Sequence, residues 1–173
     1  MSLFDEVRKL QIQDETAFTK AMNDWDHSSG FTWSSPTDGQ DFAQYIQHLA
    51  NEEEGINLPE GYVPCAVLFA FKDGDIVARA NIRHELNEFL LNVGGHIGYG
   101  VPPSHRRNSY ASEILKHAVA YLKNRGLKKV LVTCDENNIA SAKVIEANGG
   151  ILEDIRPMED NSVPAKKRYW ITI

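Results

Sequence analysis

Two apolar runs around a tight turn constrain the fold of this 173-residue chain more than any other feature. The runs cover 66–71 and 76–82, and Lys72-Asp-Gly-Asp75 lies between them. An Asp-Gly pair is typical of the turn that joins two antiparallel strands, because glycine adopts positive φ at no steric cost. Two strands therefore pair as a hairpin before any helix can cross over, which argues against a doubly wound nucleotide-binding fold.

The remaining elements are predicted from apolar periodicity and from Gly and Pro breaks. The hairpin and the later alternation of strands and helices predict an α/β fold with a mixed central sheet. In chain order we expect a short strand or irregular lead-in at 4–12, helices at 14–25 and 41–50, the hairpin, a strand at 96–101, a helix at 109–125, a strand at 130–134, a helix at 138–148 and closing strands at 151–156 and 168–173.

The composition narrows the class of protein. A chain of this length with 42% hydrophobic and 24% charged residues suits one globular domain, here 1–173. The net charge of −6 argues against nonspecific binding of nucleic acid, which requires a basic surface. No run of 18 apolar residues and no apolar leader is present, so we expect a cytoplasmic protein that does not associate with membranes.

The two cysteines, Cys65 and Cys134, lie in or beside apolar runs. We expect buried free thiols, with a disulfide or a metal pair as the less favoured alternative. No CxxC spacing and no cluster of histidine and cysteine exists, so no metal site is expected.

The segment from Gly98 to Ala111 carries the clearest chemical signal. A strand ends at Val101, a proline-containing turn follows, and a helix begins near Ser109. The first N–H groups of a helix lack backbone partners and bind phosphate well, and the neighbouring arginines add positive charge. The same residues are also explained by an ordinary capped helix with arginines exposed to solvent. Local physics alone therefore leaves open whether this segment binds an anion. The segment is neither a Walker A loop nor a GxGxxG fingerprint.

Several motifs in this region resemble those of one enzyme family. Arg106-Arg-Asn-Ser-Tyr-Ala111 is similar to the Arg/Gln-x-x-Gly-x-Gly/Ala motif of the GNAT acetyltransferases, and Tyr99-Gly-Val-Pro102 resembles the strand and turn before it. Asp135-Glu-Asn-Asn-Ile-Ala-Ser141 and Val144-Ile-Glu-Ala-Asn-Gly-Gly150 resemble the Asn-x-x-Ala/Ser helix and its glycine ending. The resemblance covers roughly 64–173.

A second pair of segments resembles a narrower group. Asn81-Ile-Arg-His-Glu-Leu-Asn87 and Gly94-Gly-His-Ile-Gly-Tyr-Gly100 are similar to a bacterial subgroup of predicted acetyltransferases. The family resemblance implies the GNAT fold, in which helices flank a mixed, mostly antiparallel sheet. It also implies an N-acetyltransferase that moves the acetyl group of acetyl-CoA to a primary amine by direct attack.

The resemblance implies a cofactor site as well. The pyrophosphate of acetyl-CoA would lie on the N–H groups of Arg107 to Ala111, and the pantetheine would pair with Tyr99 and Val101. A backbone N–H near Tyr99 would hold the thioester oxygen. Asn138 would contact the cofactor, cap its own helix, or do both. The expected cofactor-binding residues are Tyr99, Gly100, Val101, Arg106, Arg107, Asn108, Ser109, Tyr110, Ala111, Asn138 and Ser141.

Three positions depart from the family pattern. Ser109 replaces the usual glycine of the phosphate motif, where its Cβ crowds the phosphate or its hydroxyl adds a hydrogen bond. Ile145 stands where many relatives place the tyrosine that protonates the leaving thiol. The glutamate that serves many relatives as a base corresponds to Gly95, beside His96.

His96 is the first candidate for the catalytic base, because an unperturbed histidine titrates near neutral pH. A structural histidine bonded to a neighbouring loop is the alternative. His84 and Glu85 are weaker candidates for the base, and Cys134 is the weakest candidate for a nucleophile. The early loops carry aromatic residues that either line an acceptor pocket or pack on the core: Phe31, Trp33 and Tyr62. The last strand carries Tyr169 and Trp170, which belong either to the core or to an interface.

Two other classes of function remain open from the sequence. One is a CoA-binding module without turnover, because the usual tyrosine and glutamate are missing. The other is a nucleotide-binding protein that uses the same helix N-terminus. The expected partner is a small-molecule or peptide amine, with a homodimer as an open alternative.

Overall fold

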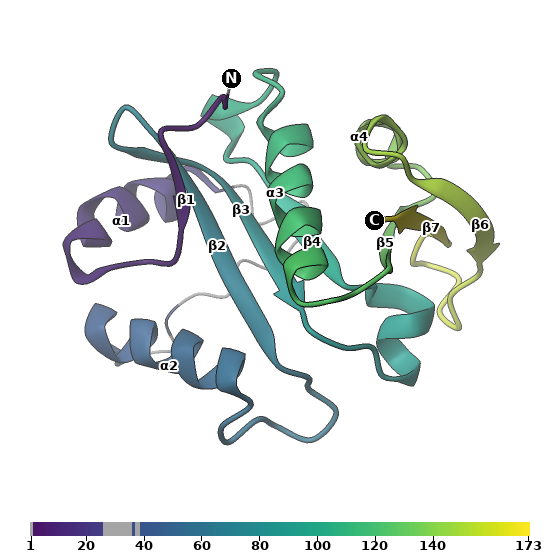
Figure 1. The fold of residues 1–173 in the computed structure, drawn as a ribbon, viewed down its shortest axis with the longest axis horizontal. Helices are drawn as coiled ribbons and strands as arrows, with labels where there is room; N and C mark the ends of the chain where they lie inside the picture. The colour runs from purple at the N-terminus through teal and green to yellow at the C-terminus, as the bar shows by residue number, and fades with distance from the viewer. Residues whose placement is uncertain (1, 26–35, 37–38) are drawn as a thin grey trace.

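The computed structural model describes residues 2–25, 36 and 39–173. The strands and helices are β1 (Glu6–Arg8), α1 (Glu15–Asp24), α2 (Phe42–Glu54), β2 (Cys65–Lys72), β3 (Asp75–Arg83), β4 (Ile97–Gly100), α3 (Tyr110–Asn124), β5 (Lys129–Asp135), α4 (Ile139–Ala147), β6 (Ile151–Arg156) and β7 (Lys166–Thr172), with 3-10 turns at Ile12–Asp14 and Pro103–His105 and a π-helical turn at Leu90–Gly94. Two helices precede the β2–β3 hairpin, and strands and helices alternate from β4 to β6 (Figure 1).

The described strands form one open sheet in the order β1-β2-β3-β4-β5-β7-β6. Every neighbouring pair is antiparallel except β4 and β5, whose parallel register is the single pair Ile97 with Val132. The predicted mixed, mostly antiparallel sheet is therefore confirmed. The β2–β3 hairpin is confirmed too, and Gly74 in its turn has φ +84°.

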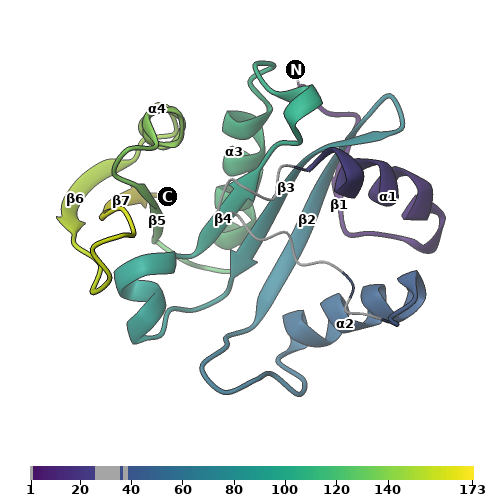
Figure 2. The same ribbon diagram turned by 180° about the vertical axis from the view of Figure 1, so that it is seen from behind.

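Helices cover both faces of the sheet. Figure 1 shows α3 in front of the strands, and the view from behind in Figure 2 shows α1 and α2 over the opposite face. One core cluster joins the sheet to α3 and α4, and it includes Ile114, Leu115 and Ile145. The other joins the sheet to α1 and α2, around Phe18, Tyr45 and Phe69. Alternate residues of β2 therefore face different cores.

Most element predictions agree with the structure to within a few residues. The lead-in contains β1, which pairs with β2. Helix α2 runs four residues beyond the predicted end, to Glu54, and stops where Gly55 adopts φ +73°. Its start is fixed by a capping box in which Asp41 accepts from the Gln44 N–H at 2.8 Å. The π-helical turn at Leu90–Gly94 was not predicted.

The thiol predictions hold in part. Both cysteines are free, as expected. Cys134 is buried, whereas Cys65 is only half-buried because it begins β2 at the margin of the core. No helix in the described part of the chain is long and apolar enough to cross a membrane.

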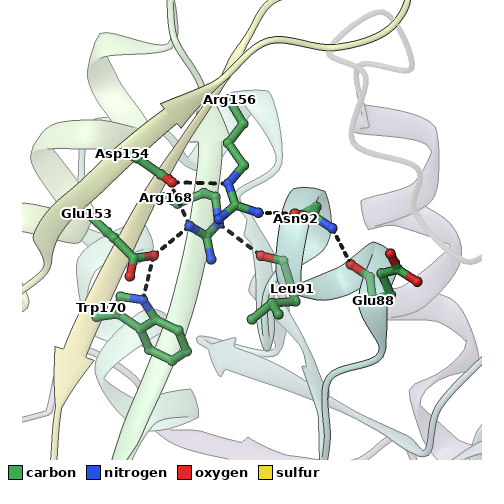
Figure 3. Close-up of polar contacts among 8 residues, drawn as sticks. All are labelled: Glu88, Leu91, Asn92, Glu153, Asp154, Arg156, Arg168 and Trp170. Atoms are coloured by element: carbon green, nitrogen blue, oxygen red, sulfur yellow. Dashed lines mark hydrogen bonds and ion pairs between the residues drawn. The ribbon is translucent and has the colours of Figure 1, made fainter.

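A buried arginine ties the β6–β7 hairpin to the π-helical turn before β4 (Figure 3). The Arg168 side chain is buried, and it donates to Glu153 Oε2 at 2.5 Å, to Asp154 Oδ1 at 2.8 Å and to the Leu91 carbonyl at 2.9 Å. Arg156 bonds both Asp154 and Asn92, so a second arginine spans the same gap. The network fixes the backbone that leads into β4.

Candidate functional site

A cavity of about 740 Å³ opens where α3 begins, between the end of β4 and helix α4. Every cofactor-binding residue predicted from the sequence lines it except Asn108. The full lining is Trp25, Tyr99, Gly100, Val101, His105, Arg106, Arg107, Ser109, Tyr110, Ala111, Ser112, Asn138, Ala140, Ser141, Lys143, Val144 and Ala147.

The residues that line the cavity carry positive charge, whereas the whole chain is negatively charged. Among the described lining residues three are cationic, Arg106, Arg107 and Lys143, and none is a carboxylate. The chain as a whole carries a net charge of −6. Cations without interspersed carboxylates favour an anionic ligand such as a phosphate.

The backbone at the start of α3 is built for close approach by an anion. Arg107 has φ +67° and Ser109 has φ +62°, both in the left-handed region that favours glycine. This conformation explains why glycine is usual where Ser109 stands. The Ser109 side chain makes no capping hydrogen bond, so the first N–H groups of α3 have no side-chain cap there.

Asn108 lies in this loop but does not line the cavity. Its side-chain amide donates to the His105 carbonyl at 3.1 Å and to the Arg106 carbonyl at 3.4 Å. The Arg106 Nε in turn donates to the Val101 carbonyl at 3.3 Å. The two side chains therefore brace the loop, which holds the start of α3 close to the end of β4.

Strands β4 and β5 separate beside the cavity. Their contact begins at His96, whose N–H donates to the Leu131 carbonyl at 2.7 Å. It ends in the described residues at Ile97 and Val132. Gly98, Tyr99 and Gly100 are half-buried beyond this point. The parting of the strands leaves room for an extended ligand beside β4.

Tyr99 spans from β4 to α4. Its hydroxyl lies 2.8 Å from Ser141 Oγ and donates to the Ser141 carbonyl at 3.3 Å. Burial raises the pKa of Tyr99 to about 12. Asn138 begins α4 and accepts from the Ser141 N–H at 3.0 Å, while it also lines the cavity. Its capping role is therefore confirmed, and its position allows cofactor contact as well.

His96 does not line the cavity, and the geometry favours the structural alternative. The side chain is only 6% exposed, and its Nδ1 accepts from the Leu131 N–H at 2.9 Å. Burial, and then the Arg83 charge, lower its pKa to about 4. The ring thus takes the place of a backbone acceptor where β4 and β5 join. A strand pattern alone does not say which partner such a ring bonds.

Replacing His96 with asparagine tests that role. The folded pKa of about 4 lies below the usual value near 6.5, so the unfolded chain binds a proton first as the pH falls. The contribution of the neutral His96 ring to the free energy of unfolding is therefore complete above pH ~6.5 and is lost as the pH falls towards ~4. Urea unfolding across this window should therefore show a flatter pH dependence for His96→Asn. A turnover loss of about 10²-fold or more would instead indicate a catalytic base.

The other sequence candidates lie away from the cavity. A Cβ on Gly95 would stand 2.6 Å from the Leu131 carbonyl oxygen, so no side chain fits there. Ile145 is fully buried in the α3–α4 core. His84 stacks on Tyr121, with Nε2 at 3.3 Å from its hydroxyl, and Glu85 lines a separate hollow beside it.

The remaining candidates contribute little to the cavity. Cys134 is buried and does not line it. Phe31 and Trp33 lie outside the described residues. Tyr62 is 65% exposed and Tyr169 belongs to the core. Trp170 is half-buried, and its Nε1 donates to Glu153 at 3.0 Å.

Sequence reasoning missed one wall of the cavity. Ala140, Lys143, Val144 and Ala147 lie on one side of α4. Their spacing of three, four and seven residues is that of a single helical face. Applying this spacing to the predicted helix at 138–148 would therefore have found them.

Ser109→Gly should relieve strain at the start of α3. A non-glycine residue in the left-handed region costs on the order of 1–2 kcal/mol, and the extra freedom of glycine in the unfolded chain offsets part of the gain. We expect urea unfolding to show stability higher by up to about 1 kcal/mol. Ala120→Gly, on an exposed turn of the same helix, should lower stability by about 1 kcal/mol. A loss of stability in Ser109→Gly would contradict the proposal that the backbone at Ser109 is strained.

Comparisons with known proteins identify the family of the chain. The model of the acetyltransferase (GNAT) domain family matches residues 6–151. A sequence search of curated proteins finds no match.

Several solved structures share the fold. RimJ from Mycobacterium smegmatis, in complex with CoA-disulfide, superposes with a TM-score of 0.67 at 19% identity, over 96% of this chain and 80% of that one. The ribosomal-protein-S18-alanine N-acetyltransferase from Escherichia coli gives 0.59 at 17% identity, over 97% and 93%. The acetyltransferase of the GNAT family from Streptococcus pneumoniae gives 0.67 at 16% identity, over 97% and 99%. Because the family model covers most of the chain, this protein belongs to the GNAT acetyltransferase family.

Proposed function

We propose that this protein transfers the acetyl group of acetyl-CoA to a primary amine of a small molecule or a peptide. The observation that carries the proposal is the cationic cavity at the start of α3, which opens beside the parting of β4 and β5. A diphosphate requires N–H donors and positive charge, and a pantetheine chain requires a narrow slot next to a strand. Cationic side chains at the first turn of α3 and the end of β4, where it parts from β5, both line this one cavity.

Each part of the cavity suits one part of acetyl-CoA. Arg106, Arg107 and the N–H groups of the first turn of α3 would hold the pyrophosphate. The backbone of Tyr99 and Val101 would pair with the pantetheine. An N–H of this strand would then hold the thioester oxygen and stabilise the negative charge that develops there.

The chemistry is direct attack of a neutral amine on the thioester carbon. A C–N bond forms, the C–S bond breaks, and CoA leaves as a thiol. The described lining of the cavity has no carboxylate, excludes His96 and includes one imidazole, that of His105. In this proposal the amine loses its proton to water, directly or through His105.

Binding of acetyl-CoA gives the first test. At 100 times its dissociation constant, a ligand specific for the folded state adds about 2.7 kcal/mol to stability. We therefore expect a clear rise in melting temperature with acetyl-CoA and with CoA, and none with ATP. A shift with ATP that CoA competes away would favour the nucleotide-binding alternative.

Turnover gives the second test. The thiol released from acetyl-CoA should be measured with a panel of amines that includes small amines, peptides with free N-termini, and lysine side chains. Release that depends on an amine supports the proposal. Tight CoA binding without release across the panel would favour the non-catalytic module.

A further inference from the structure

Strand β3 carries an asparagine whose side-chain oxygen has no partner. Asn81 is half-buried, and its Oδ1 is shielded from solvent without accepting a hydrogen bond from any described residue. An unpaired buried acceptor destabilises a fold, so its presence calls for an explanation. Asn81 does not line the cavity at the start of α3, so a cofactor held there does not supply the missing donor.

The pairing of the strands places the Asn81 side chain on the face of the sheet that α1 and α2 cover (Figure 2). Asn81 is paired with Val67 of β2 and with Gly98 of β4. Val67 belongs to the core cluster under α1 and α2, whereas the next pair along, Ile82 with Ile97, belongs to the cluster under α3. Paired residues share a face and successive residues alternate, so Asn81 and Gly98 lie side by side on the α1/α2 face.

This face offers an acceptor amine a path to the thioester. In the proposed acetyl transfer the thioester lies beside β4 beyond Ile97, where β5 parts from it. Towards α3, β4 is packed, because Ile97 is buried and Tyr99 contacts the core. Towards α1 and α2, it presents Gly98 and Gly100, which have no side chains. Strands lie about 4.8 Å apart, so a nitrogen seated over Gly98 is one strand spacing from Asn81 and one from the gap beside β4.

The polar side chains that flank Asn81 offer donors rather than acceptors. In β3, Arg83 donates to two backbone carbonyls at the end of the π-helical turn, at 3.2 and 3.1 Å. Arg79 is fully buried, and a guanidinium has no acceptor atom. Before β4, the His96 Nδ1 already accepts from the Leu131 N–H, which leaves only the Nε2–H of the neutral ring. Among these described neighbours, Asn81 alone has an oxygen to receive the N–H of a ligand.

The same arginines favour a neutral ligand. Arg79 and Arg83 lie two residues to either side of Asn81 and share its face. Burial lowers the pKa of Arg79 to about 10, so its guanidinium stays charged at neutral pH. Positive charge on both sides of Asn81 disfavours an ammonium group and favours the neutral amine, which is the form with a lone pair.

We propose that the Asn81 side-chain oxygen holds the acceptor as a neutral primary amine, above Gly98 on the α1/α2 face. This inference extends the proposed acetyl transfer and depends on it. One N–H of the amine donates to Asn81, which turns the lone pair towards the thioester carbon. The C–N bond forms and the C–S bond breaks. The nitrogen gives its other proton to water and the leaving sulfur takes one from water, while Asn81 exchanges none.

Such a contact selects primary amines. A primary amine has two N–H groups, so one can remain on Asn81 while the other loses its proton. A secondary amine has a single N–H, which cannot both stay on Asn81 and be lost. Asn81 is therefore proposed as a residue that determines acceptor specificity as well as acceptor position.

Stability is the first measurement, because it requires no acceptor. Asn81→Leu keeps the size of the side chain and removes the unpaired oxygen, so the urea midpoint should stay equal or rise. Asn87→Leu is the matched control. Asn87 is also half-buried, but its amide donates to the Gly61 carbonyl at 2.8 Å and its Oδ1 accepts from the Leu90 N–H at 2.9 Å. Its midpoint should fall. A comparable fall in Asn81→Leu would indicate a structural asparagine and overturn the inference.

Selectivity between amines tests the contact itself. A primary amine that supports wild-type turnover would be compared with its N-methyl derivative, by thiol release at saturating acetyl-CoA. Asn81→Leu and Asn81→Ala should lower kcat/KM for the primary amine by about 10- to 100-fold and affect the N-methyl amine much less. The preference for the primary amine should therefore shrink. Asn87→Leu should keep the wild-type preference, and all variants should keep wild-type affinity for acetyl-CoA.

The two Asn81 variants keep the test decisive if leucine does not fit, because alanine removes the same oxygen without adding bulk. A wild-type preference in the folded Asn81 variants would overturn the inference and leave the proposed function intact. Wild-type protein that binds CoA but turns over no primary amine would refute the proposed function, and the inference with it.

Discussion

Ala111→Glu is expected to weaken the binding of acetyl-CoA by at least about 100-fold while the protein stays folded. Ala111 lies in the first turn of α3 and lines the cavity. A glutamate there adds bulk and a negative charge where the pyrophosphate would lie. The fold should tolerate it, because a carboxylate in the first turn of a helix interacts favourably with the helix dipole.

The matched control is Ala120→Glu. Ala120 lies on the same helix and is exposed, so it receives the same change away from the cavity. Isothermal titration calorimetry with CoA should give wild-type affinity for Ala120→Glu and no measurable heat of binding for Ala111→Glu. Circular dichroism would confirm that both variants are folded. Normal CoA affinity in Ala111→Glu would place the phosphate site elsewhere.

Gly95→Ala is expected to have the largest effect on stability, a loss of about 3 kcal/mol or more. Gly95 combines φ +63° with ψ −170°, a conformation that is essentially restricted to glycine. An added Cβ would stand 2.6 Å from the Leu131 carbonyl oxygen, which is backbone and already accepts from the His96 N–H. Relief of the clash would require β5 to move away from β4, at the point where the two strands join.

Gly126→Ala isolates the conformational part of that cost. Gly126 has φ +92°, but an added Cβ would meet nothing within 4 Å. We expect a loss of about 1 kcal/mol there, from backbone strain alone. Urea unfolding of both variants measures the difference. Equal losses would show that β5 accommodates the methyl group and that the contact with Leu131 is not restrictive.

Sequence patterns predicted most elements because each depends on neighbouring residues. The Asp73-Gly74 turn and the apolar runs beside it specify the β2–β3 hairpin locally. The motif from Arg106 to Ala111 likewise led to residues that line the cavity, with Asn108 as the exception. An asparagine side chain is compatible with cofactor contact, but the Asn108 amide instead donates to carbonyls of its own loop.

The features that were not predicted depend on contacts between distant segments. The Arg168 network joins residues 77 positions apart, and no local pattern in β7 says that this arginine is buried. The π-helical turn at Leu90–Gly94 receives part of its support from the same network. The bond from the Leu131 N–H to the His96 ring also spans two strands, so no local pattern could decide between a catalytic and a structural histidine.

The order of strands at one side of the sheet has a consequence for biosynthesis. β6 is made before β7, yet among the described strands it pairs only with β7, which lies between β6 and β5. During translation, β6 therefore has no place in the sheet until β7 has emerged from the ribosome. The Arg168 contacts that brace the backbone before β4 are completed at the same late stage. Nascent chains should consequently acquire the hairpin and α3 early, and the capacity to hold a ligand only after β7 has emerged.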